Sequence, residues 1–167
     1  MTLPPWAEVT SVRRGHIERV AALLGDWAGA MATPAGERAR WLRAAWLHDA
    51  LRDAPFADPL AHGPAAAERA ATEGEHDAGV LSAVRYHTIG FAGWDDTGRM
   101  LYLADFLEPG RDFDPAGRRA LAARVPADRD GVLREVARRR IEWILASGWA
   151  LPSETVAFWN GLAGGPQ

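Results

Sequence analysis

Apolar residues recur at three- and four-residue steps along nearly the whole chain of 167 residues, and no segment alternates convincingly between apolar and polar side chains. This is the period of one face of an α-helix, whereas a half-buried strand repeats every two residues. In the first such segment, about residues 10–31, one stripe contains Val12, His16, Val20, Leu23 and Trp27. The pattern predicts an all-α fold, a helical bundle of about seven or eight helices.

Capping and turn residues divide this pattern into segments. Thr33-Pro34 predicts an N-cap followed by proline at the first helical position, and Gly74 predicts a helix end. Ser153 predicts the N-cap of a last, short helix. After the first segment, helices are expected over about residues 34–54, 62–73, 77–87 and 96–107, from 114, over 128–147 and from 153. The helix over 128–147 is expected to bury Val132, Val136, Ile141, Ile144 and Leu145.

The length suits one domain over residues 1–167, with a core over about 10–160 and frayed ends that include the tail 161–167. No apolar run is long enough to span a bilayer, and Met1 to Trp6 does not resemble a signal peptide. A net charge of -3 argues against general nucleic-acid binding. We therefore expect a cytoplasmic protein that binds neither nucleic acid nor membrane.

Two missing residue types exclude several reaction classes. The chain has no cysteine, which excludes disulfides, a thiolate nucleophile and cysteine metal sites. All 19 basic residues are arginines, so a phosphate-binding loop of the Walker type and Schiff-base chemistry are excluded because both need lysine.

Four of the five histidines and two aspartates occur on or beside apolar stripes, in the order His16, His48, Asp49, His62, His87 and Asp105. Imidazole and carboxylate groups are ligands of iron, manganese, cobalt, nickel and zinc. Any one of these histidines could be a satisfied core residue, but burying the whole set without a cation would be costly. A carboxylate can bridge two ions, and paired ions are used to cleave phosphate esters. The set predicts a two-metal hydrolase of a phosphate or nucleotide substrate.

Other polar and aromatic residues allow two interpretations each. Arg52 and Arg111 are candidate phosphate ligands, with surface ion pairs as the alternative. The arginines between residues 134 and 140 are expected to form a solvated helix face, with nucleotide binding as the alternative. Trp94 is interpreted as a core or rim residue, although its loop near His87 would let it stack on a base. The fifth histidine, His76, lies in a polar stretch and is interpreted as a surface residue.

Four blocks of sequence resemble the HD-domain metal phosphohydrolases, and most closely the YqeK-type HD proteins, which are symmetrical hydrolases of bis(nucleosyl) tetraphosphates. The resemblance covers about residues 10–160 and is strongest over 42–112. The blocks are Trp46-Leu-His-Asp49 with Arg52, His62-Gly-Pro64, Arg85-Tyr-His-Thr88, and Tyr102-Leu-Ala-Asp105-Phe-Leu-Glu108-Pro-Gly-Arg111. The family usually has lysine where this chain has Arg52 and Arg99, which keeps the charge but changes the shape.

The resemblance implies a site with two divalent ions, of which iron is preferred and manganese, cobalt and nickel are alternatives. One ion would be held by His16, His48, Asp49 and Asp105, and the other by His62 and His87 with Asp49 bridging. Asp49 and Arg52 would be catalytic. The substrate-binding residues would be Arg52, Arg85, Thr88 and Arg111. The implied reaction is attack by an activated water on an inner phosphorus of diadenosine tetraphosphate, which gives two ADP.

Three alternatives to this reaction remain. The chain could be another HD phosphohydrolase that acts on a nucleoside monophosphate or on guanosine tetraphosphate. It could instead be an oxygenase with a mixed-valent di-iron pair, or a sensor that binds nucleotides without turnover. The sequence also leaves open whether the chain forms a homodimer.

Overall fold

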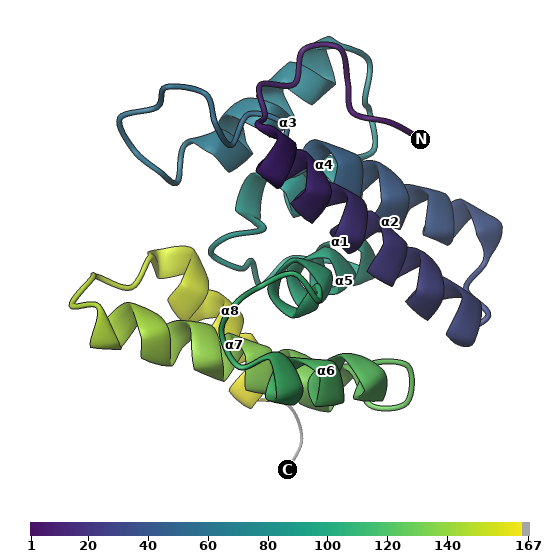
Figure 1. Ribbon diagram of the computed structural model, residues 1–167. Coiled ribbons are helices and arrows are strands. Elements are labelled where there is room, and N and C mark those ends of the chain that lie inside the picture. Colours follow the sequence, from purple (N-terminus) through teal and green to yellow (C-terminus); the bar gives the residue numbers. More distant parts are fainter. Residues whose placement is uncertain (165–167) are drawn as a thin grey trace.

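A computed structural model describes residues 1–164, in which eight helices and no strands are found (Figure 1). The predicted all-α bundle is therefore confirmed. The helices are α1 (Ser11–Ala30), α2 (Ala35–Leu47), α3 (His62–Thr72), α4 (Ala78–Tyr86), α5 (Asp96–Leu107), α6 (Pro115–Arg124), α7 (Arg129–Ala146) and α8 (Ser153–Ala163). The expected frayed tail begins inside α8, and its last residues, 165–167, lie outside the described part of the chain.

Helix α5 is the centre of the bundle. Nine of its twelve residues are buried, as expected for a helix that is surrounded by other helices. It contacts α1, α2 and α4 on one side and α6 and α7 on the other. Figure 1 shows this arrangement, with α1–α4 above α5 and α6–α8 below it. A side chain on α5 can therefore reach both halves of the molecule.

The start of α1 is tied to the turn that follows α2, at residues 48–53. The backbone N–H and the hydroxyl of Thr10 both donate to Asp53 Oδ2, at 2.7 and 2.9 Å. Just before it, the N–H of Glu8 donates to the carbonyl of Ala50 at 2.7 Å. These bonds fix the position of α1 relative to the turn.

Two helices begin differently from the expectation. Thr33 is not the N-cap of α2, and Ser153 is not the N-cap of α8, because Pro34 and Pro152 occupy those positions without a side-chain capping bond. Both prolines have extended backbone angles, with ψ of 144° and 145°. The proline ring fixes φ near the value that a helix entry needs, so α2 begins one residue later than predicted and α8 begins one residue earlier.

Two apolar residues that were predicted to be buried are exposed. Val12, in the first turn of α1, is 80% exposed, and Leu145, in the last turn of α7, is 58% exposed. All four buried residues of α7 lie between 132 and 137. Its C-terminal half therefore projects beyond the core, which the apolar period alone could not reveal.

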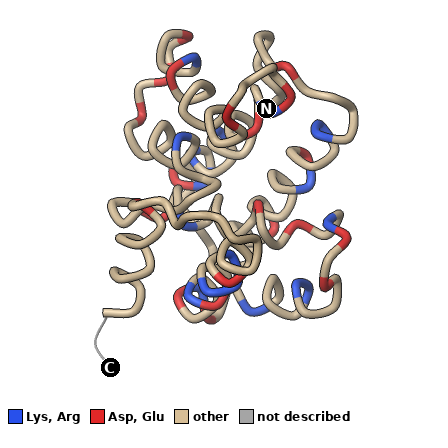
Figure 2. Tube along the Cα trace, turned by 90° about the vertical axis from the view of Figure 1, so that its left-hand side faces the viewer, with Lys and Arg blue, Asp and Glu red and all other residues tan. Residues whose placement is uncertain are grey.

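Charged residues of both signs are interspersed over most of the helices (Figure 2). None of the helices in residues 1–164 combines the length and apolar character that crossing a membrane requires.

Asp77 joins α4 to α2, and its replacement should cost stability in a pH-dependent way. Its carboxylate caps α4 by accepting from the N–H groups of Gly79 and Val80, and the guanidinium of Arg40 donates to it at 2.7 and 3.0 Å. The bonds from Arg40 lower the pKa of Asp77 to about 2. We expect Asp77→Ala to destabilise the fold by about 1–2 kcal/mol at pH 6, measured by urea unfolding.

The sign of the pH dependence follows from the lowered pKa. Because the folded state holds the carboxylate ionised, its contribution is complete above the ordinary aspartate pKa and is lost as the pH falls towards 2. The difference between wild type and Asp77→Ala should therefore shrink between pH 5 and pH 3. Asp77→Asn keeps an N-cap and should cost less than the alanine variant. A difference that is independent of pH would contradict this assignment.

Candidate metal centre

The six predicted ligand residues come from five different helices or their ends, and the fold brings them together. His16 lies in α1 and Asp105 in α5, while His62 is the first residue of α3. His48 and His87 are the C-caps of α2 and α4, and Asp49 follows directly in the turn. Helix α2 ends at Leu47 and not before Pro55 as predicted, so this turn is free to aim both side chains inward. All six residues are at most 6% exposed.

Asp49 lies between two pairs of histidines. Its Oδ1 is 3.3 Å from the Nε2 atoms of both His62 and His87. Its Oδ2 is 3.7 Å from the Nε2 atoms of both His16 and His48. Each pair forms with Asp49 a group whose ligand atoms are close enough to hold one cation. The two groups therefore share one carboxylate, in which each oxygen faces a different pair.

The outer nitrogens of three histidines fix the direction of their rings. Nδ1 of His48, His62 and His87 each donates to the carbonyl oxygen three residues earlier, at 2.7, 2.6 and 2.8 Å. A neutral ring that donates through Nδ1 has a lone pair on Nε2, which faces the interior here. Burial lowers the pKa of His48 to about 4, so this ring is neutral at pH 7.

The inward-facing atoms fit a cation. The Nε2 atoms of His62 and His87 lie 3.1 Å apart, and both face Asp49 Oδ1. Because both rings donate through Nδ1, their Nε2 atoms and the carboxylate oxygen are left as a set of three donor atoms that a cation between them could bind. Nitrogen and oxygen donors of this kind suit divalent transition metals such as iron, manganese and cobalt.

Asp105 completes the cluster from the side of α5. Its Oδ1 lies 3.1 Å from Nε2 of His16 and accepts a bond from Arg111 at 2.6 Å. Its Oδ2 accepts a bond from Arg140 of α7 at 2.8 Å. Burial alone would raise the pKa of Asp105, but the charge of Arg111, the hydrogen bond with His16 and the charge of Arg140 hold it well below its usual value. This carboxylate is therefore ionised at neutral pH.

Glu108 sets the orientation of His16, and the sequence reasoning did not identify it as a site residue. It is 1% exposed, and its Oε1 lies 3.1 Å from Nδ1 of His16. Arg19 and the N–H of Gly110 donate to its Oε2, at 2.5 and 2.6 Å. A carboxylate on the outer nitrogen of a histidine is a common partner in metal sites, where it fixes the ring and increases its basicity. The sequence feature that could have identified Glu108 is its position three residues after Asp105, in the block that ends at Arg111.

Two arginines at the cluster were also missed. Arg13 donates to Asp49 Oδ2 at 2.8 Å, and it could have been found because it lies one helical turn before His16. Arg140 was expected on a solvated helix face, and this interpretation is wrong. Its guanidinium turns inward because it can lie over the ring of Tyr102, 4.3 Å from the centroid, while it binds Asp105.

The predicted substrate-binding residues are not all at the cluster. The hydroxyl of Thr88 lies 3.2 Å from Nε2 of His87, and Arg111 binds Asp105. Arg85 instead pairs with Glu68 on the surface, at 3.2 Å. The guanidinium of Arg52 makes no hydrogen bond or ion pair to the residues that the structure describes.

Trp94 and His76 lie away from the cluster. Trp94 is 4% exposed, donates to the carbonyl of Ser82 and packs against Tyr102 and Phe158. It is therefore a core residue, and the alternative that it stacks on a base is wrong. His76 is exposed, as predicted.

Gly63 lets α3 approach the end of α4 closely. A Cβ atom at this position would lie 2.8 Å from the carbonyl oxygen of Arg85 and 3.1 Å from that of Val84. Both contacts are with backbone, which cannot move aside easily. The glycine therefore permits the helix spacing at which His62 and His87 meet.

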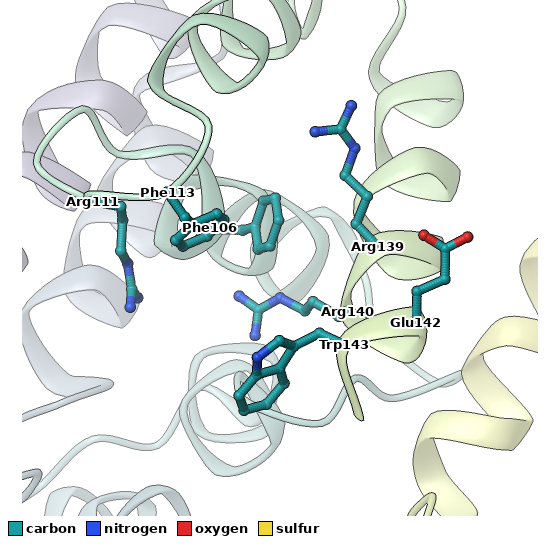
Figure 3. Close-up of a pocket in the computed structure, with 7 residues that line it drawn as sticks. All are labelled: Phe106, Arg111, Phe113, Arg139, Arg140, Glu142 and Trp143. Carbon is teal, nitrogen blue, oxygen red and sulfur yellow. The ribbon is translucent and has the colours of Figure 1, made fainter. Parts of the chain in front are cut away.

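A cavity of about 540 Å³ adjoins the cluster on the side of α7 (Figure 3). Arg111 and Arg140, which both bind Asp105, belong to its lining. The other lining residues are Phe106, Phe113, Arg139, Glu142 and Trp143.

Comparisons with known proteins identify the family of the chain. A family model described as HD domain matches residues 13–118. Curated relatives from Halalkalibacterium halodurans and Staphylococcus aureus carry the name symmetrical bis(5'-nucleosyl)-tetraphosphatase. They are 29% identical over 108 residues and 26% identical over 102 residues. These matches include 64% and 60% of this chain but only 57% and 53% of the relatives, so the chain spans little more than half the length of the curated relatives it matches.

The fold is also similar to that of a solved structure. A crystal structure described as a predicted HD superfamily hydrolase involved in NAD metabolism, from Clostridium acetobutylicum, superposes with a TM-score of 0.79. The likeness covers 93% of this chain and 91% of that chain, at 21% sequence identity. It extends through nearly the whole helical bundle and so supports the fold.

The shared carboxylate predicts that each cation can be removed separately. His62→Ala should remove a ligand from one group and leave the other intact, and His16→Ala should do the reverse. We expect each variant to retain about one metal ion where the wild type holds about two, because each loses one ligand set only. Metal analysis by mass spectrometry of the purified proteins measures this.

The exposed histidine provides the control. His76→Ala should keep the metal content of the wild type, because His76 lies away from both groups. Equal metal loss in all three variants, or none in His62→Ala and His16→Ala, would refute the two-group interpretation.

Proposed function

The chain belongs to the HD-domain family, and from this premise we propose that it is a metal-dependent phosphohydrolase that cleaves diadenosine tetraphosphate symmetrically into two ADP. The observation that carries the proposal is the position of Asp49, whose two oxygens face separate pairs of histidines. A shared carboxylate of this kind is what a pair of neighbouring cations requires.

We assign the ligands as the family resemblance implies. His16, His48, Asp49 and Asp105 would hold one divalent ion, and His62 and His87 would hold the second, with Asp49 common to both. Bound ions would supply Lewis-acid activation of a phosphoryl group and of the attacking water. Iron is the preferred metal, with manganese, cobalt and nickel as alternatives that the donor set also suits.

The chain's own cations would balance the charge of the phosphates. Arg111 and Arg140 already lie against Asp105, and Arg13 lies against Asp49. A carboxylate oxygen has two lone pairs, so it can bind a cation and still accept a bond from an arginine. Fixed guanidinium groups beside a reacting phosphate stabilise the charge that develops on its oxygens. The hydroxyl of Thr88 and the guanidinium of Arg52 are further proposed donors to phosphate oxygens.

The names of the curated relatives support the choice of substrate. Both are called symmetrical bis(5'-nucleosyl)-tetraphosphatase, and the HD-domain match over residues 13–118 includes all six candidate ligands. A small nucleotide is therefore the proposed partner of the site. Symmetrical cleavage requires attack at an inner phosphorus, which releases ADP from both halves of the substrate.

A chromatographic product assay tests the proposal. The purified protein, with its metal content determined, would be incubated with diadenosine tetraphosphate in the presence of iron(II), manganese(II) or cobalt(II). We expect ADP as the sole product and loss of turnover after treatment with a chelator, with recovery when the metal is restored. AMP plus ATP would contradict symmetrical cleavage. No turnover with any metal would contradict the assigned substrate.

Asp49→Ala provides the catalytic control. Because it removes the ligand common to both cations, we expect turnover to fall at least a thousandfold, on the order of the loss of an essential catalytic group. Circular dichroism would verify that the variant is folded. A folded, metal-free Asp49→Ala protein with full activity would refute the mechanism.

A further inference from the structure

The cavity beside α7 has aromatic side chains as walls. Phe113, in the loop before α6, and Trp143, on α7, are 50% and 58% exposed although both are large apolar residues. In Figure 3 they lie on opposite sides of the guanidinium of Arg140, with Phe106 beside Phe113. Exposed aromatic side chains that face a common hollow are typical of a ligand pocket and not of a solvated surface.

These walls are held in place by their neighbours. Phe113 packs edge-on against Phe106, at a centroid distance of 5.5 Å, and the guanidinium of Arg118 lies 4.8 Å from its ring centroid. Trp143 packs edge-on against Trp149 at 5.0 Å. The rings are therefore positioned before any ligand arrives, which lowers the entropy cost of binding.

The cavity shares two cationic side chains with the candidate metal centre. Arg111 and Arg140 line it, and both bind Asp105. The Nε atoms of both arginines are buried and make no hydrogen bond among the described residues. Buried donors without partners are uncommon, and an anionic ligand would satisfy them.

From this arrangement we propose that the cavity binds the nucleobase and ribose of a nucleotide, with Trp143 and Phe113 contacting the base and Arg140 directing the phosphate chain towards Asp105. This inference rests on the proposed function, because it assigns one half of the same substrate to a place on the protein. A planar base matches aromatic walls, and its attached phosphates match the two arginines. Trp143 and Arg140 lie beyond residue 118, where the match to the family ends, whereas Phe113 lies within the matched residues, so the inferred subsite joins both parts of this chain.

Binding of two probes to the manganese-loaded protein tests the inference. Isothermal titration calorimetry would measure the affinity for ADP, which carries a base, and for tripolyphosphate, which carries none. Chromatography would verify that both remain intact. We expect Trp143→Ala and Phe113→Ala each to weaken ADP binding about tenfold, the loss of one stacking contact, and to change tripolyphosphate binding less than twofold.

Leu145→Ala is the matched control. Leu145 is on the same helix and similarly exposed, but it does not line the cavity, so its replacement should leave both affinities unchanged. Unchanged ADP affinity in Trp143→Ala and Phe113→Ala would overturn the inference. Equal weakening of ADP and tripolyphosphate would also overturn it, because the base would then not be what the rings contact.

The outcome is separate from that of the proposed function. Selective loss of ADP affinity would support the subsite even if diadenosine tetraphosphate were not cleaved. Symmetrical cleavage with unchanged KM in both aromatic variants would support the function and overturn the subsite.

Discussion

The burial of the Asp49 carboxylate among four imidazoles is the constraint on which the rest of the structure depends. A carboxylate and several ring nitrogens in a dry interior repel one another unless protons or cations lie between them. The protein aligns three of the rings through backbone carbonyls, so the direction of each Nε2 atom is set by the local helix geometry. The site is thus built into the helix ends and not into mobile loops.

Arginine performs several tasks in this lysine-free chain. Arg13, Arg111 and Arg140 reach the buried carboxylates from three different elements, whereas Arg85 pairs on the surface. A planar guanidinium can lie over an aromatic ring and bind a carboxylate at once, as Arg140 does over Tyr102. This residue connects α7 to the centre of the bundle and links the C-terminal helices to the chemistry.

The helical period, a local signal, was sufficient for the fold class, and the resemblance supplied the candidate ligands that the fold brings together. The sequence did not reveal Arg140, whose inward turn depends on a ring supplied by α5, or the exposure of Leu145, which depends on where packing on α7 ends. Glu108 lay within a recognised block, but its contact with His16 spans 92 positions and has no periodic signature. The misplaced start of α2 had a local cause, since Pro34 itself occupies the cap.

Gly63 has a consequence for the choice of cation. The separation of His62 and His87 is limited by contact between the backbones of α3 and α4, not by the rotation of flexible side chains. Rigid backbone cannot move apart easily, so the spacing of the two Nε2 atoms would limit which ions both rings could bind together. Any such selectivity would come from Gly63, which has no side chain and is not itself a candidate ligand.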